Sequence, residues 1–391
     1  MCLCQAILLS NMSEPIRALE FYCGIGGLRS ALARSSIGAN ATVVRAFDWD
    51  QTATAVYTEN HGPGIAHRVD IGTLDANTLE QLNANLWLLS PPCQPYTVLN
   101  QKAKGATDPR AQSFLHLVED VLPALAERGA APVCLLLENV AGFEVSSTRV
   151  RTLVILTKLG FVTRELLLTP LQFGVPNSRL RYYLLASRLP GAFSSSIDSN
   201  RILRHIPGHG SDWSDARSSA ASPQMIESPV RTLRDYLDGI TTQSAYAVPE
   251  RVLMKWGRLF DIVLPSAKRT CCFTRGYTQL VERSGSILQE NEELDTAETF
   301  EKFQLAQASG DGRAVEILRP LRLRYFSPEE LLRLSHFEEL GSESTFRWPE
   351  SVSTKAKYRL LGNSVNVRVK HRICRPTHLH PSSEPDIKNQ R

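Results

Sequence analysis

A glycine-rich turn between a short strand and a helix is the feature that most restricts the fold of this chain. Residues 16–22 are mostly apolar and predict a strand, residues 23–27 (Cys-Gly-Ile-Gly-Gly) predict a tight turn, and a helix is expected from Leu28 to Arg34. Glycine is favoured where the backbone takes a positive φ or approaches another group closely. This order of elements predicts the first βα unit of a Rossmann-like sheet.

An acidic residue follows the next predicted strand. Residues 42–47 form that strand and end in Asp48-Trp49-Asp50. Asp48 lies about 20 residues beyond the turn, the spacing at which an acidic side chain reaches a ribose hydroxyl in such a fold. The glycines follow GxGG rather than the full GxGxxG dinucleotide pattern, and together with Asp48 they indicate a nucleoside cofactor site. Trp49 offers an aromatic face for adenine, and packing between helices explains it equally well.

The best candidate nucleophile is Cys93. It lies in the run Ser-Pro-Pro-Cys-Gln-Pro at 90–95, directly after an apolar strand predicted at 86–89. The two prolines stiffen the loop and place the thiol at the carboxyl end of a strand, where open parallel sheets bind ligands. A buried structural cysteine is the alternative, but it does not require such a loop. Because few ordinary thiols are ionised at pH 7, Cys93 needs a partner group.

Glu138 is the candidate partner. It follows the apolar residues 133–137, which predict a buried strand. A carboxyl group at the tip of a hydrophobic strand is partly desolvated and can stay protonated, which suits it as an acid or hydrogen-bond donor. A surface glutamate that caps the next loop is the alternative.

Five sequence blocks occur in the order of the cytosine-C5 methyltransferase motifs, and the chain resembles that family. Five ordered blocks are far more specific than any one of them. They are residues 21–27 (FYCGIGG), 90–95 (SPPCQP), 138–140 (ENV), 177–183 (NSRLRYY) and 359–365 (RLLGNSV).

Three further segments resemble the eukaryotic branch of the family that methylates tRNA-aspartate. They are residues 138–149, Cys272-Phe273-Thr274 before Arg275-Gly276-Tyr277, and residues 323–326 (LRYF). The resemblance covers about residues 14–367. It implies an α/β fold, a Rossmann-like S-adenosylmethionine-dependent methyltransferase domain with a smaller target-recognition domain inserted.

The resemblance also implies a mechanism. Cys93 would add to C6 of cytosine and make C5 nucleophilic. Glu138 would donate to N3, while Arg179 and Arg181 would hold O2 and the adduct. These arginines alternate along a predicted strand, so they share one face of it, and a salt-bridging role is the alternative.

The implied substrate is a tRNA, with cytosine 38 of the tRNA-Asp anticodon loop as the target, since loop bases are already partly unstacked. DNA cytosine-C5 methylation is one alternative, and a non-catalytic nucleic-acid-binding isoform is another. The implied cofactor-binding residues are Phe21, Gly24, Gly26, Gly27, Asp48, Trp49, Asp70, Ile71, Pro92, Asn363, Ser364 and Val365. The expected substrate-binding residues are Lys268, Arg269, Cys272, Phe273, Thr274 and Arg275.

Basic and acidic residues separate in the second half of the chain. The net charge of +4 is mild, so a nucleic-acid surface must be local. Residues 251–283 carry seven Lys or Arg against two acids, and aromatic residues interleave with them. This pattern suits phosphate contact and base stacking, although a solvated basic face is nearly as good an explanation. The acidic stretch from Glu290 to Glu301 predicts an exposed helix away from RNA.

The chain is long enough, with 391 residues and 42% hydrophobic composition, for a large domain and a smaller one. We expect an N-terminal extension at 1–13, a catalytic domain at 14–190 with a return segment at 321–367, a target-recognition domain at 191–320 and an atypical tail at 368–391. Ser327-Pro328-Glu329-Glu330 predicts a capped helix at the start of the return. The tail lacks the apolar helix of the family, which puts activity in doubt.

Other functions are disfavoured by the composition. The eight cysteines are scattered with no CxxC pair, which favours a reducing compartment and no metal site. No run reaches membrane-spanning length, and residues 1–11 lack the basic leader of a secretory signal. We therefore expect a cytoplasmic or nuclear protein, or one found in both.

Overall fold

The core of the molecule is a seven-stranded sheet with the strand order β3-β2-β1-β4-β5-β7-β6. The computed structural model describes residues 15–96, 105–190, 192–193, 201–207, 229–239 and 245–373. All neighbouring strands pair in parallel except β7, which is antiparallel to β5 and β6. The sheet is therefore mixed rather than purely parallel, and the expected fold class is confirmed. The strands are β1 (Ile16–Phe21), β2 (Ala41–Asp48), β3 (Ala66–Arg68), β4 (Leu86–Leu89), β5 (Cys134–Val140), β6 (Val162–Leu168) and β7 (Arg181–Ser187).

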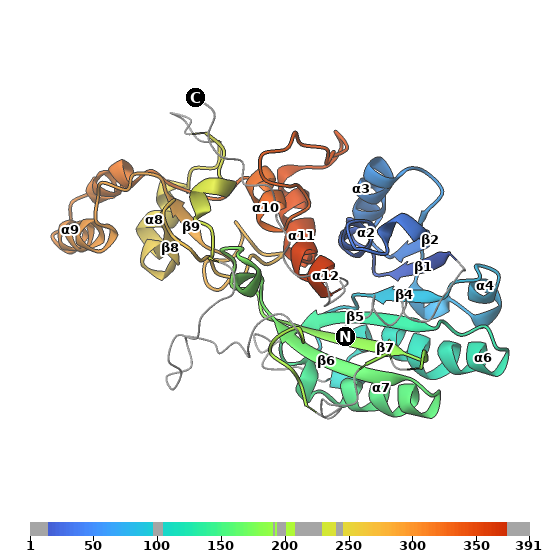
Figure 1. The fold of residues 1–391 in the computed structure, drawn as a ribbon. Coiled ribbons are helices and arrows are strands. Elements are labelled where there is room, and N and C mark those ends of the chain that lie inside the picture. The colour runs from blue at the N-terminus through green and yellow to red at the C-terminus, as the bar shows by residue number, and fades with distance from the viewer. Residues whose placement is uncertain are drawn as a thin grey trace.

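Helices cover both faces of this sheet (Figure 1). Because side chains alternate along a strand, Leu86 and Leu88 of β4 pack on one face, and Trp87 and Leu89 pack on the other. The first face is covered by α2 (Gly27–Ala33) and α3 (Gln51–His61). The second face is covered by α4 (Ala76–Glu80), α5 (Gln112–His116), α6 (Leu122–Glu127) and α7 (Ser147–Lys158).

A smaller lobe lies beside the large sheet, with the return helices between them in Figure 1. Its sheet has the order β10-β9-β8, and its apolar core is built around Phe303 and Leu318. Most of this lobe comes from residues 191–320, the range expected for the target-recognition domain, whereas β10 belongs to the expected return segment 321–367. Its elements are α8 (Glu250–Trp256), β8 (Ile262–Val263), β9 (Ile287–Gln289), α9 (Thr296–Ala308) and β10 (Leu323–Arg324), and the return helices are α10 (Pro328–Leu334), α11 (Thr354–Asn363) and α12 (Val367–Ile373).

The start of the expected atypical tail is a regular helix. In α12, Val369 and Ile373 lie four residues apart and bury their side chains in the cluster that contains Leu28 and Leu32 of α2. The prediction that an apolar face is missing is therefore wrong for residues 368–373, because this spacing places both side chains on one side of the helix. The predicted N-terminal extension at 1–13 and the rest of the predicted tail, residues 374–391, lie outside the described residues.

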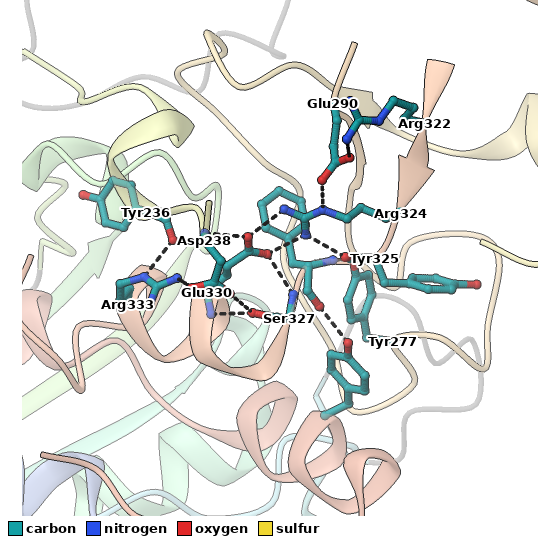
Figure 2. Close-up of polar contacts among 12 residues, drawn as sticks. Tyr236, Asp238, Tyr277, Glu290, Arg322, Arg324, Tyr325, Ser327, Glu330 and Arg333 are labelled. Carbon is teal, nitrogen blue, oxygen red and sulfur yellow. Dashed lines mark hydrogen bonds and ion pairs between the residues drawn. The ribbon is translucent and has the colours of Figure 1, made fainter. Parts of the chain in front are cut away.

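A buried network of charges attaches the smaller lobe to the return segment (Figure 2). Arg324 of β10 donates to both carboxylate oxygens of Glu330 on α10, at 2.8 and 2.7 Å, and to Glu290 at 2.6 Å. Arg322 forms a second ion pair with Glu290 at 2.9 Å. Ser327 and Glu330 form the predicted capping box. Buried ions need such partners, since each alone would carry a large desolvation cost.

The acidic stretch from 290 to 301 differs from the prediction at its beginning. Glu290 is buried in the network just described, and α9 begins only at Thr296. The prediction of one exposed helix is therefore wrong for Glu290. The reason is tertiary: the ion-pair partners Arg322 and Arg324 follow Glu290 by some thirty residues in the chain.

Candidate active site

The carboxyl ends of β1, β2, β4 and β5 surround a cavity of about 450 Å³. This volume is within the range of small-molecule sites, and the sheet edge is where α/β folds bind ligands. The rim also includes the end of α11. Twelve of the predicted site residues line the cavity, namely Gly24, Asp48, Trp49, Asp70, Ile71, Pro92, Cys93, Glu138, Arg179, Arg181, Asn363 and Ser364.

Asp48 is held by backbone donors at the edge of the cavity. Its Oδ2 accepts a hydrogen bond from the backbone N–H of Gly24 at 2.8 Å, and its Oδ1 accepts one from Asp50 at 2.8 Å. Burial raises the pKa of Asp48, and these backbone donors oppose the rise. Each carboxylate oxygen has a second lone pair, so Asp48 can still accept a ligand hydroxyl.

Trp49 is an exposed aromatic surface on the cavity. Its side chain is 66% exposed, and the guanidinium carbon of Arg68 lies 5.8 Å from the ring centroid. The alternative that this indole packs between helices is therefore wrong. One face of the ring interacts with a cation, which leaves aromatic surface for a planar ligand.

The glycine turn lines the cavity through Gly24, and its other glycines allow neighbouring side chains to pack closely against the backbone. Gly24, Gly26 and Gly27 are the glycines of the turn, and the first two have positive φ values of 53° and 85°. A Cβ at Gly26 would overlap His61, and one at Gly27 would overlap Val365. Gly26, Gly27 and Val365, which were expected to bind the cofactor, do not line the cavity.

Phe21, which was expected at the cofactor site, does not line the cavity. Its side chain is fully buried in the core and stacks on Phe47 with ring centroids 5.4 Å apart. Because β1 alternates between its two faces, Phe21 points into the core below the cavity. The neighbouring Tyr22, which the sequence reasoning missed, lines the cavity and shares a hydrogen bond of 2.9 Å with Ser113. Its position directly after the strand was the available signal.

Cys93 and Glu138 line the same cavity, as predicted. Cys93 is half-buried in the loop after β4, and burial raises the pKa of its thiol, while the positive charges of Arg181 and Arg179 oppose the rise. Glu138 lies within β5 rather than after it, and it is 6% exposed. Its Oε1 is 3.7 Å from Nε of Arg181.

The two arginines differ in their surroundings, and the strand that was expected to carry both begins only at Arg181. Arg181 donates to the backbone oxygen of Leu180 at 2.7 Å and to Sγ of Cys272 at 3.5 Å. Arg179 donates to Sγ of Cys272 at 3.3 Å and to the backbone oxygens of Phe273 at 2.9 Å and Gly362 at 3.3 Å. Burial raises the pKa of Cys272, but the two guanidinium groups outweigh it and hold the pKa below its ordinary value.

The remaining predicted substrate residues do not line the cavity. Lys268 and Arg275 are exposed, and Arg269 forms an ion pair with Asp261 at 2.8 Å. The backbone N–H of Thr274 donates to the oxygen of Ser284 at 2.9 Å. These positions are close in sequence but present their side chains to different surroundings.

Two of the aromatic residues in the basic segment cannot stack on bases. Phe273 and Tyr277 are buried and pack against each other, with ring centroids 5.0 Å apart. These rings are not available to stack on a base, because both belong to the core below the return helices. Trp256, in contrast, is 39% exposed.

The described part of the chain contains no group of three or more His, Cys, Asp or Glu side chains arranged for a metal ion. None of the helices within the described ranges is long and apolar enough to cross a membrane.

Comparison with known proteins identifies the family. A Schizosaccharomyces pombe protein named tRNA (cytosine(38)-C(5))-methyltransferase is 39% identical over 358 residues, which cover 91% of this chain and 95% of that protein. A Dictyostelium discoideum protein named DNA (cytosine-5)-methyltransferase is 32% identical over 389 residues, with 91% and 92% coverage. The solved structure of the S. pombe Dnmt2 methyltransferase matches at 36% identity and a TM-score of 0.72, and covers 92% of this chain and 98% of that one.

The family model for C-5 cytosine-specific DNA methylases matches residues 16–377. That range includes the glycine turn, the Cys93 loop, both cavity arginines and the return segment. The resemblance inferred from the five ordered blocks is thereby confirmed. This chain belongs to the C-5 cytosine-specific DNA methylase family.

Proposed function

We propose that this chain transfers a methyl group from S-adenosylmethionine to C5 of cytosine 38 in a tRNA anticodon loop, as in tRNA-Asp. The observation that carries the proposal is that Cys93, Glu138 and Arg181 line the same cavity as Asp48 and Trp49. One cavity therefore brings the groups that would act on a pyrimidine next to the groups that would hold a nucleoside. The name of the S. pombe relative supports tRNA as the substrate.

The cavity residues fit S-adenosylmethionine. Asp48 would accept hydrogen bonds from the ribose hydroxyls, and Trp49 would stack on the adenine. A Cβ at Gly24 would meet no atom within 4 Å, so the turn leaves open space here. Asn363 and Ser364 would close the wall from the return segment. When it is bound, S-adenosylmethionine supplies an electrophilic methyl group carried on a sulfonium.

The protein's own groups would make the cytosine nucleophilic. The thiolate of Cys93 forms a bond to C6, and Glu138 donates a hydrogen bond or proton to N3 as negative charge develops in the ring. Arg181, which is 3.7 Å from Glu138, stabilises that charge. C5 then gains the methyl group, loses its proton, and the electron pair released expels Cys93 from C6.

The base must leave its stack to enter such a cavity. A tRNA anticodon loop reduces this cost, since its bases are already partly unstacked. Lys268 and Arg275 are exposed and are suited to phosphate contacts, whereas Arg269 is already paired with Asp261. We therefore expect Lys268 and Arg275, rather than Arg269, to contact the RNA backbone.

The test is methyl transfer from labelled S-adenosylmethionine to a tRNA-Asp transcript, to the same transcript with uridine at position 38, and to duplex DNA. We expect incorporation only with cytosine at position 38, and none with Cys93→Ala. Equal incorporation with uridine at position 38 would show that the methylated base lies elsewhere in the RNA.

DNA methylation is the second candidate. It is favoured by the name of the Dictyostelium relative and by catalytic chemistry that does not depend on the sugar. Faster methyl incorporation into duplex DNA than into the tRNA would favour DNA methylation as the function. A chain that binds tRNA but transfers no methyl group would instead be the non-catalytic isoform, although the helical start of the tail and the grouping of Cys93 with Glu138 favour turnover.

A further inference from the structure

Arg179 connects two chain segments that are far apart in the sequence. Its Nη1 donates to the backbone oxygen of Phe273 at 2.9 Å and to Sγ of Cys272 at 3.3 Å. Its Nη2 donates to the backbone oxygen of Gly362 at 3.3 Å and to that of Ser364. Both terminal nitrogens are thus engaged by protein acceptors, and little donor capacity remains for a base.

The same two segments touch through a glycine. A Cβ at Gly362 would overlap the backbone of Thr274 and Arg275. The φ of Gly362 is not in the left-handed region, so this close approach is the reason that glycine is required here. On its other side, the return segment packs Val365 against Gly27 with no room for a Cβ.

Residues 362–365 are therefore packed between the glycine turn and residues 272–275. Asn363 and Ser364 line the cavity that would hold the cofactor. Cys272 contacts Arg181, which is the partner of Glu138. A continuous path of close contacts leads from the cofactor part of the site to the groups that would act on the base.

We propose that Arg179 is a positioning residue that couples cofactor binding to the order of residues 272–275, and through them to binding of the target cytosine. The guanidinium is planar and forked, so it holds two acceptors on each segment in a fixed relation. A ligand that orders residues 362–364 therefore reduces the cost of ordering 272–275. This inference rests on the proposed function for the identity of the RNA, and it replaces the expected contact of Arg179 with the base.

Hydrogen exchange tests the coupling without RNA. On addition of S-adenosylhomocysteine, we expect the amides of residues 271–276 to exchange more slowly in the wild-type protein. In Arg179→Lys, which keeps the charge but lacks the fork, protection should remain at the glycine turn and be lost at 271–276. The control is Arg347→Lys, an exposed arginine, which should behave as wild type.

Two results would overturn the proposal. One is wild-type protein in which S-adenosylhomocysteine leaves exchange at 271–276 unchanged, a result that needs no variant to fold. The other is Arg179→Lys with the same protection at 271–276 as wild type.

Binding experiments measure the same coupling from the RNA side. Because linkage is reciprocal, S-adenosylhomocysteine should tighten tRNA binding to the wild type by about 5-fold or more. The factor should fall towards 1 in Arg179→Lys and in Gly362→Ala. Gly312→Ala is the control, since a Cβ there meets no atom within 4 Å.

The outcomes separate the two proposals. Wild-type protein that binds no tRNA would count against the proposed function, while the exchange experiment would still decide the role of Arg179. An unchanged coupling factor in folded Arg179→Lys and Gly362→Ala, with normal tRNA methylation by the wild type, would reject the role of Arg179 alone.

Discussion

The side-chain amide of Asn139 donates a hydrogen bond to the backbone oxygen of Pro91 at 3.2 Å. Asn139 is the neighbour of Glu138 in β5, and Pro91 precedes Cys93 by two residues. The bond therefore fixes the strand that carries the candidate acid against the loop that carries the candidate nucleophile. The relative position of these two groups depends on a buried polar contact between segments that are far apart in sequence.

Replacing Asn139 by alanine should reduce kcat more than it changes cofactor affinity. It leaves the buried oxygen of Pro91 without its donor, at a cost of about 1 to 3 kcal/mol, and loosens the loop. A small misplacement of reacting groups can lower the rate by about 100-fold. Steady-state kinetics and calorimetry with S-adenosylhomocysteine measure the two effects. Asn77→Ala, whose partner Arg128 is exposed, is the control. Equal losses in both measurements would indicate general unfolding instead.

The thiol of Cys93 should make methyl transfer depend on pH. Burial raises the pKa of Cys93 in the free protein, so less thiolate is present at pH 7 than for an ordinary cysteine. Since the thiolate is the nucleophile, kcat/KM should rise with pH through the neutral range and beyond about pH 8.5 before it levels off. The rate of Cys93 alkylation in the free protein should follow the same curve. An alkylation rate that is already constant at pH 7 would contradict this.

Glu20 should make stability fall with increasing pH. It is fully buried, and desolvation raises its pKa to about 7, although the Tyr57 hydroxyl, the Arg29 backbone N–H and the charge of Lys370 lower it. A folded pKa above the unfolded value means that the native state retains a proton, so its stabilising effect is complete below about pH 4.5 and is lost as pH rises through about 7.

Glu20→Gln should remove most of this dependence, which corresponds to about 3 kcal/mol. The melting temperature of the variant should exceed that of the wild type at pH 8 and match it near pH 4.5. The same difference between the two proteins at both pH values would show that Glu20 does not titrate in this range.

Trp49 and Arg68 should affect cofactor affinity to different degrees. Trp49→Ala removes an exposed stacking surface and should weaken S-adenosylhomocysteine binding by about tenfold. Arg68→Ala removes only the cation beside the ring, worth about 0.5 to 1 kcal/mol, and should weaken binding a few-fold. Calorimetry checks both values. Trp256→Ala in the smaller lobe should bind with wild-type affinity.

The exposed cations of the smaller lobe should determine the salt dependence of RNA binding. Replacing Lys268 and Arg275 by glutamine should weaken tRNA binding and flatten its dependence on salt, because fewer counterions are released. Arg269→Gln should have less effect, since its charge is already paired with Asp261. Filter binding over a range of salt concentrations measures the slopes. A slope unchanged in the double variant would place the RNA on another surface.

Local sequence determined much of the fold. Glycines mark the turn after β1 because they permit positive φ values. Prolines end β4 and stiffen the Cys93 loop because their φ is fixed whatever surrounds them. Apolar runs located β4 and β5, and the Ser327 capping box was predicted from four consecutive residues. The grouping of Asp48, Cys93 and Glu138 followed from their common place at the carboxyl ends of parallel strands in one sheet.

Only the tertiary structure decided what many side chains contact. Neighbouring positions such as Phe21 and Tyr22 look alike in sequence, yet one is in the core and the other lines the cavity. The backbone acceptors of Arg179 lie about 90 and 180 residues further along the chain, so its pairing could not be predicted from the local sequence. Glu290 is buried for a similar reason, since its partners Arg322 and Arg324 come from a segment some thirty residues further along the chain. Local sequence restricts the backbone, whereas burial and polar pairing depend on which distant segments pack together.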